Sequence, residues 1–365
     1  MRTNITQEEN HLVRKLVVRI EKVLSIYTLE QANEWDIIVR SFKDYDVYWL
    51  SSYVKTFQIN GDGEPILFFY DDGSTRGINV VMKRDIAKDP RFREKIENDR
   101  YFDFATPYGY GGWLIEGRNS ENLFQAYFEW LECNDIICEF VRFHPIAKNH
   151  EVCNNYYDIV RLGKIVYMDL SSPEVIWNNL KSENRNRIRK ANKNGIRVYD
   201  GEFSDIKNQF YTIYRETMGR NNADDYYYFN PAYYQSIISE LENHSRAFWA
   251  EKDGEIIAAY IMIYANNRMN YHLSGSLGDY NYLAPGNLIM YTAALWGCEK
   301  GFQTLLLGGG VGSKDDNLLR FKRTFFKGEL DHFYIGKKIV NPEKYNYLCN
   351  LRGPTKSAFF PKYRG

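Results

Sequence analysis

The stretch from Leu305 to Phe326, LLLGGGVGSKDDNLLRFKRTFF, decides how the second half of the chain is interpreted. Three leucines that run directly into glycine predict a short buried strand. The glycines at 308–310 have no side chains, so a ligand or another backbone segment can approach the strand end closely. One of the polar residues at 315–317 can then cap a helix over about 318–326. The stretch therefore predicts a strand, a bare corner and a short basic helix in succession.

Two interpretations of this corner stay open on these residues alone. The glycines can form no more than a tight turn, and the helix cations Arg320, Lys322 and Arg323 can simply be solvated, as surface lysines usually are. In the other interpretation a ligand enters at the corner and meets the lysine that follows Phe321.

Composition limits the classes of partner. The 365 residues predict two domains rather than one, each large enough to bury a core. Lys plus Arg and Asp plus Glu both number 47, so no overall field draws the chain to DNA or to a membrane, and any basic site must be a local patch. Aromatic residues make up 16% of the chain, which favours an ordered protein.

Cysteine usage and the first residues indicate a cellular compartment. The five cysteines, an odd number, form no CxxC or metal-binding spacing, which is typical of a reduced cytoplasmic protein with buried thiols. The stretch 1–31 is charged throughout and has no apolar run suited to a signal peptide or a membrane span. We therefore expect a cytoplasmic protein without a transmembrane segment.

The order of predicted elements in the first half returns in the second. A hairpin pattern at 65–86 is followed by a glycine-interrupted strand at 107–117, a helix at 122–135 and a strand at 137–145. In the second half the corresponding ranges are a hairpin at 246–264 turned at Asp253-Gly254, a strand at 267–277, a helix at 284–301 and a strand at 303–310. We expect an α/β (α+β) protein with a first domain over 1–160, a second over 161–340 and a tail over 341–365 that packs back on the body.

The most basic stretch lies between the expected joint, 144–160, and the second hairpin. Ser172 and Pro173 predict a helix start and Gly195 its end. Between residues 181 and 197 the single acid is Glu183, against seven cations: Lys181, Arg185, Arg187, Arg189, Lys190, Lys193 and Arg197. Such a run can be a solvated helix face. It can equally bind an anionic partner, a phosphate-bearing ligand or an RNA end, which would relieve the repulsion.

Five segments in this order resemble the Fem family of aminoacyltransferases and the related N-acyltransferases of the GNAT superfamily. They are PYGYGG at 107–112, NLKSENRNRIRKANKNGIRV at 179–198, FYTIYRETMGRNNADDYYYF at 210–229, LLLGGGVGSKDDNLLRFKRTF at 305–325 and FYIGKKIVNPEKYNYL at 333–348. No single motif is strict, but five in the right order are more specific than any one. The resemblance spans most of the chain, from about Tyr48 to Leu348.

The resemblance implies two GNAT-like domains, each a mixed sheet flanked by helices, with a cleft between them. Fem proteins move an amino acid from aminoacyl-tRNA to an amine of a peptidoglycan precursor, and GNAT enzymes move an acyl group from coenzyme A to an amine. Both reactions pass through a tetrahedral oxyanion, which needs a cation or amide donors aimed at it. No tightly bound cofactor is implied, because the donor is a substrate.

The resemblance also implies roles for particular residues. Lys322 would stabilise the oxyanion and Phe321 would pack on the donor. Residues that would line the acceptor side are Arg220, as a bidentate phosphate clamp, with Lys55, Tyr108 and Tyr110; the tyrosines can also be packing residues. Residues that would contact the donor are Gly308, Gly309, Gly310, Arg185, Arg189 and Lys190.

Two departures from the family patterns leave the donor open. The long helical hairpin found in the second domain of many Fem proteins is not visible, and neither is the Q/R-x-x-G-x-G/A loop of coenzyme A-dependent GNATs. GSLGDYNYLAPGN takes that place, with Gly278 and Gly286 ahead of a helix start that can attract an anion.

Three functions are therefore compatible with the sequence. They are an aminoacyltransferase that uses charged tRNA and a cell-wall or surface-polysaccharide precursor, an acyl-CoA-dependent N-acyltransferase acting on an amino sugar, and a non-catalytic binding module. None of the six histidines lies in a nucleophile motif, which disfavours a Ser-His-Asp hydrolase. The lack of His and Cys clusters likewise disfavours a metal enzyme.

Overall fold

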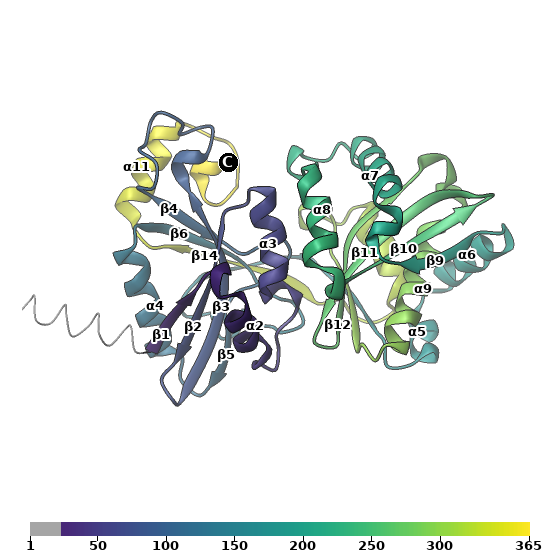
Figure 1. Ribbon diagram of the computed structural model, residues 1–365, viewed down its shortest axis with the longest axis horizontal. Helices are drawn as coiled ribbons and strands as arrows, with labels where there is room; N and C mark the ends of the chain where they lie inside the picture. Colours follow the sequence, from purple (N-terminus) through teal and green to yellow (C-terminus); the bar gives the residue numbers. More distant parts are fainter. Residues whose placement is uncertain (1–22) are drawn as a thin grey trace, which may run out of the picture.

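The computed structural model describes residues 23–365 and has two lobes side by side, each built on one β-sheet (Figure 1). The expectations for residues 1–22 lie outside the described residues. The expected α/β (α+β) class, with two mixed sheets flanked by helices, is confirmed.

The first sheet has the strand order β1-β2-β3-β4-β6-β14-β7, with β5 also paired to β3. The bounds are β1 Leu24–Tyr27, β2 Glu64–Asp71, β3 Thr75–Asp85, β4 Phe102–Ala105, β5 Leu114–Gly117, β6 Ile136–Arg142, β7 Asp158–Lys164 and β14 His332–Ile339. The helices of this lobe are α2 Ala32–Arg40, α3 Ser51–Asn60, α4 Glu121–Cys133 and α11 Pro342–Arg352.

The second sheet has the order β8-β13-β12-β11-β10-β9. Its bounds are β8 Val166–Asp169, β9 Arg197–Gly201, β10 Ser245–Lys252, β11 Glu255–Ala265, β12 Arg268–Ser276 and β13 Thr304–Gly308. The helices of this lobe are α5 Pro173–Asn179, α6 Ser182–Lys193, α7 Phe203–Arg220, α8 Pro231–Glu240, α9 Pro285–Glu299 and α10 Asn317–Lys322. Both sheets are mixed, because β4 pairs with β6, and β12 with β13, in parallel.

Two strands depart from the expected division of the chain. β14 lies within 161–340, which the sequence assigned to the second domain, but it pairs with β6 and β7 in the first sheet. β7 straddles the expected boundary at residue 160 and also belongs to the first sheet. The division by residue order is wrong at these strands, because hydropathy along the chain does not reveal which sheet a strand joins.

Local sequence signals account for the start of some helices. Ser172 caps α5 by accepting a hydrogen bond from Val175 N at 3.1 Å, and Asp316 caps α10 by accepting one from Leu319 N at 2.8 Å. The expected single basic helix is instead two helices, α5 and α6, because the chain is extended at Leu180 and Lys181. The expected strand at 107–117 is regular only in β5.

A continuous core joins the two lobes. It contains Trp49, Tyr53 and Phe57 from the first half and Phe210 and Tyr233 from the second, all buried. Helices α3 and α8 pack against each other at this junction (Figure 1). Because this core is shared, it fixes the position and orientation of one sheet relative to the other.

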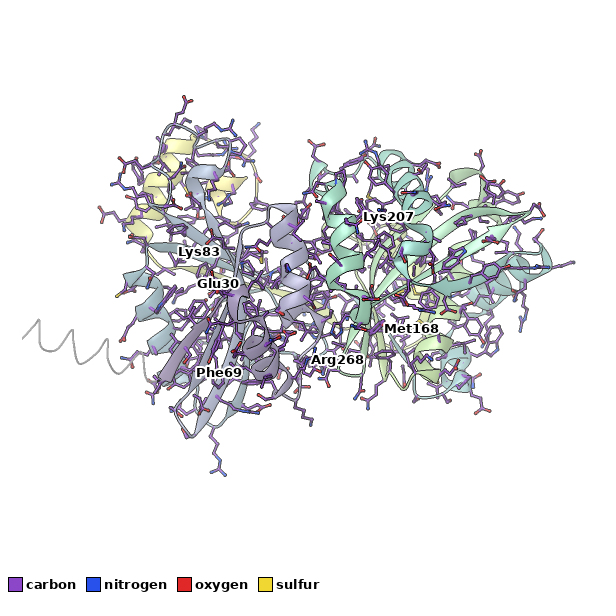
Figure 2. The ribbon with its side chains drawn as sticks, viewed as in Figure 1. Glu30, Phe69, Lys83, Met168, Lys207 and Arg268 are labelled. Atoms are coloured by element: carbon purple, nitrogen blue, oxygen red, sulfur yellow. The ribbon has the colours of Figure 1, made fainter. Side chains whose placement is uncertain are left out.

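Polar contacts at the junction also hold the two lobes in place relative to each other. Arg268 binds the Asp44 carboxylate at 2.8 Å, and Figure 2 shows Arg268 at the boundary between the lobes. Behind it, buried Asp46 accepts hydrogen bonds from His144 at 3.0 Å and from Asn270 at 3.0 Å. Burial lowers the pKa of His144 in spite of the Asp46 carboxylate, so the imidazole is neutral and donates through Nε2.

The chain end folds onto the first sheet. Tyr363 is buried and its hydroxyl donates to Asp103 at 2.9 Å, while Arg364 binds the same carboxylate at 2.6 Å. Burial alone would raise the pKa of Asp103, but Arg84 and Arg364 hold it below its usual value. Residues 341–365 thus share a buried ion cluster with β4.

Candidate active site

The central feature of the second sheet is the point where two parallel strands separate. β12 and β13 pair only at Arg268–Thr304, Met269–Leu305 and Asn270–Leu306. Beyond these pairs β12 continues through Tyr271 while β13 ends at Gly308, so the two strand ends leave an opening between them. The glycine corner predicted from the sequence forms one side of this opening.

Lys322 fills the opening from α10. Its side chain is buried, and Nζ donates a hydrogen bond to the carbonyl oxygen of Gly309 at 2.7 Å. Nζ also lies 5.4 Å from the centre of the Tyr271 ring. Burial lowers the pKa of Lys322 to about 7, against the opposing effect of Asp316. The amine therefore carries a proton that it can lose near neutral pH.

Gly308 marks the space in front of this amine. Its φ of 74° is in the left-handed region, which glycine occupies without strain. A Cβ atom placed on Gly308 would lie 3.3 Å from the hydroxyl of Tyr110 and 3.7 Å from Lys322 Nζ. The hydroxyl of Tyr110, from the first lobe, and the amine of Lys322, from the second, thus flank the position of this Cβ atom. This position is the point in front of Gly308. Burial raises the pKa of Tyr110, so its hydroxyl keeps its proton and can donate.

The other two glycines of the corner have mainly structural contacts. A Cβ atom on Gly309 would meet the Lys164 carbonyl oxygen at 2.8 Å, and one on Gly310 would overlap the Lys314 carbonyl oxygen. Gly309 also supplies the carbonyl that holds Lys322. Of the three, Gly308 is the one that faces both Tyr110 and Lys322.

A basic groove lies on the other side of α10. It has a volume of about 610 Å³ and is lined by Lys181, Glu183, Arg187, Asn317, Arg320, Phe321, Arg323 and Thr324. Four of these residues are cations and one is an acid. Phe321 is half-buried on the groove wall, one residue from the buried lysine. The groove therefore brings an anion-attracting surface next to Lys322.

The basic residues of α6 divide between two faces. Arg187 lines the groove, whereas Arg189 lies with its guanidinium 5.4 Å from the Trp177 ring and Lys190 lies 5.7 Å from the Tyr282 ring. Arg185 is half-buried beside them. The predicted donor residues Arg185, Arg189 and Lys190 therefore do not line the groove, while Lys181 and Arg187 of the same stretch do.

The acceptor-side predictions fall in different places. Tyr110 reaches the point at Gly308, and half-buried Tyr108 stacks on Phe57 with ring centres 5.4 Å apart. Lys55 pairs with Glu240 of α8 at 3.1 Å. Arg220 binds Glu216 at 2.9 Å and the Ser276 carbonyl oxygen at 2.8 Å. Both cations already have protein partners, and their role toward an acceptor stays a prediction.

Three residues near these groups were not selected from the sequence. Tyr271 packs beside Lys322, and its hydroxyl donates to Ser274. His272, the next residue, points to the opposite face, where its ring meets Tyr108 and hydrogen-bonds Tyr233 at 2.6 Å; burial lowers its pKa to about 3. Arg142 ends β6 close to Tyr110.

A signal for one of them was present in the sequence. Successive side chains of a strand point to opposite faces of the sheet, so the predicted strand 267–277 places Tyr271 and His272 on opposite faces. This alternation predicts that one of the two, Tyr271, lies on the same face as the glycine corner. Arg142 carries no such pattern, because its neighbours come from separate strands.

Comparison with known proteins agrees with this architecture. Residues 179–323 match the model of an acetyltransferase (GNAT) domain. Over 172 residues the chain is 25% identical to the UDP-N-acetylmuramoylpentapeptide-lysine N(6)-alanyltransferase of Weissella viridescens. That match covers 46% of this chain, and the chain spans about half (49%) of the length of this curated relative.

Solved structures share the fold over a longer range. The crystal structure of FemX matches with a TM-score of 0.63 at 13% identity, over 88% of this chain and 99% of that one. The C-terminal domain of a putative lysylphosphatidylglycerol synthetase from Agrobacterium fabrum matches with a TM-score of 0.53 at 15% identity, over 87% and 92%. The resemblance seen in the sequence is confirmed as a similarity: residues 179–323 match a GNAT domain, and the fold is similar to that of FemX.

Residues 23–365 contain neither a metal-binding cluster nor a membrane-spanning helix. Within residues 23–365, no group of three or more His, Cys, Asp and Glu side chains is arranged to hold a metal ion. None of the helices in that range combines the length and apolar character required to cross a bilayer.

Proposed function

We propose that this Fem-like protein of the GNAT superfamily transfers an aminoacyl group from aminoacyl-tRNA to an amine of a cell-wall or surface-polysaccharide precursor. The nitrogen lone pair of the acceptor attacks the acyl carbonyl carbon, and the carbonyl π electrons move to oxygen. When the tetrahedral intermediate collapses, the C–O bond to the ribose breaks and a C–N amide bond forms. The nitrogen loses one proton and the ribose oxygen gains one.

The single observation that carries the proposal is the point in front of Gly308. Lys322 Nζ and the hydroxyl of Tyr110 lie 3.7 Å and 3.3 Å from it, and the Lys322 side chain is buried while that of Tyr110 is half-buried. An oxyanion there would receive a charge-assisted hydrogen bond from the ammonium and a second hydrogen bond from the phenol. The two donors come from different lobes, which the shared core holds in place.

The charge on Lys322 gives the proposal a pH signature. Its pKa is lowered to about 7 by burial, so the ammonium is present below pH 7 and is lost as the pH rises above it. Single-turnover transfer should therefore decline about tenfold per pH unit well above pH 7. In Lys322→Arg, the guanidinium stays protonated, and the decline should move upward by several pH units. A rate that keeps rising through pH 7 in the wild type would contradict the role of the ammonium.

The groove favours tRNA as the donor. Its four cations, at Lys181, Arg187, Arg320 and Arg323, can follow successive phosphates of a strand whose end reaches Phe321. The finding that the relative from Weissella viridescens is an alanyltransferase is in line with an amino acid as the transferred group.

The donor can be tested by binding alone. Deacylated tRNA should bind with a marked salt dependence, and the double variant Arg187→Ser/Arg320→Ser should lower the salt slope by about two and weaken binding at least tenfold in low salt. Lys207→Ser on α7 (Figure 2), outside the groove, is the control and should bind as the wild type does. If coenzyme A stabilises the protein against thermal unfolding and tRNA does not bind at low salt, the tRNA hypothesis is wrong. Acyl-CoA, the second candidate, is then the donor.

A binding module that kept the fold remains the third possibility from the sequence. It predicts that neither charged tRNAs nor acyl-CoA thioesters support transfer to any amine. If mass spectrometry detects the new amide with any one donor–acceptor pair, the binding-module hypothesis is excluded.

A further inference from the structure

The first sheet has its own parallel strand pair, and a short loop interrupts the pairing near its end. β4 and β6 run in parallel as far as Ala105 and Phe140. Beyond this pair, residues 107–110 form a loop that carries Tyr108 and Tyr110. The chain then returns to the end of β6, where Gly111 N–H donates to the Arg142 carbonyl oxygen and Gly111 bridges Phe143 in parallel. The side chain of Arg142 binds this loop, because its Nε donates to the carbonyl oxygen of Gly109 at 2.9 Å.

The guanidinium of Arg142 is held in one orientation. Besides the bond to Gly109, its Cζ lies 5.3 Å from the centre of the Phe333 ring. The Gly109 carbonyl is itself fixed, since this residue has a φ of 94° and a Cβ atom there would overlap the Tyr48 ring. Little conformational entropy is therefore left for a ligand to remove.

Arg142 differs from the other cations on the acceptor side in having no acidic partner. It is exposed, and within residues 23–365 its Nη groups have no hydrogen-bond acceptor and no ion pair. Lys55 and Arg220 instead bind Glu240 and Glu216. The two free Nη groups of a fixed guanidinium form a fork that matches the two oxygens of a phosphate or a carboxylate.

Tyr110 connects this fork to the point at Gly308. The Tyr110 ring packs edge-on against Phe333, with centres 5.6 Å apart, so Phe333 contacts both Tyr110 and Arg142. The Tyr110 hydroxyl reaches Gly308 and Lys322. An acceptor whose amine attacks the carbonyl held in front of Gly308 can thus extend along Tyr110 toward Arg142.

We propose that Arg142 binds an oxyanion of the acceptor, a phosphate or a carboxylate, and so sets which amines reach the opening between β12 and β13. This rests on the proposed function, in which the acceptor lies on the Tyr110 side. Arg142 binds the substrate at a distance from the reacting atoms, so its loss should affect acceptor affinity much more than donor affinity.

Direct binding tests the proposal without any transfer reaction. Calorimetric titrations would use uridine diphosphate as the phosphate probe and a lysine-containing peptide with a free C-terminus as the carboxylate probe. Arg142→Gln should bind the relevant probe roughly 10- to 100-fold more weakly than the wild type does. Arg142→Lys should recover only part of the loss, because an ammonium cannot form the fork. Arg161→Gln is the matched control, an exposed arginine on β7 paired to the opposite edge of β14, and should leave binding unchanged.

The two probes separate the possible anions. Weaker binding of uridine diphosphate alone assigns Arg142 to a phosphate, and weaker binding of the peptide alone assigns it to a carboxylate. Equal affinities for both probes in the wild type and in Arg142→Gln would overturn the proposal. So would a wild-type protein that binds neither probe at millimolar concentration. Because transfer is not measured, these results are independent of whether a donor has been found.

Discussion

Replacing Lys322 by Met should lower the rate of transfer by roughly 100-fold or more while the protein stays folded. The ammonium lies 3.7 Å from the point in front of Gly308, and removing one donor to a developing oxyanion costs on the order of 3 kcal/mol of barrier. Because the charge acts in the transition state, the loss should appear in kcat with little change in KM for either substrate.

Folding should tolerate this change because Met matches the shape of the lysine stem. The main structural loss is the hydrogen bond to the Gly309 carbonyl oxygen, worth about 1 kcal/mol. Lys314→Met, on the exposed loop before α10, is a suitable control and should keep normal turnover. Thermal unfolding of both variants checks the fold. Near-normal turnover in Lys322→Met would remove the residue from the mechanism.

The elements around Lys322 could be predicted because their signals are local. A leucine run that ends in glycine gives β13, and the Asp316 side chain gives the start of α10. A buried lysine, however, has the same sequence signature as an exposed one. Its burial follows from the separation of β12 and β13, which depends on pairing between residues more than 30 positions apart.

Contacts between the lobes explain the other differences. Tyr110 was selected from a family motif, but its position beside Lys322 depends on the packing of the two sheets against each other. In the same way, the return of β14 to the first sheet brings Phe333 under Arg142, which gives that arginine a fixed orientation. Residues whose role comes from several distant segments leave no periodic pattern in the sequence.

Replacing Gly308 by Ala should reduce transfer by about 100-fold, because the new methyl group would occupy the point that the substrate oxygen needs. The Cβ atom would lie 3.3 Å from the Tyr110 hydroxyl and 3.7 Å from Lys322 Nζ, so the protein can accept it without a severe clash while a substrate atom cannot share the space. Displacing a reacting group by about 1 Å is enough to cost a factor of this size.

Backbone strain must be separated from this effect, because an alanine at a φ of 74° costs roughly 1–2 kcal/mol wherever it occurs. Gly195, at the end of α6, has the same φ of 74°, and a Cβ atom there would have nothing within 4 Å. Gly195→Ala should therefore lose a similar amount of stability in thermal unfolding but keep its activity. If Gly308→Ala retained activity equal to that of Gly195→Ala, the substrate would not pass through the point between Tyr110 and Lys322, and the reaction centre would have to lie elsewhere in the cleft.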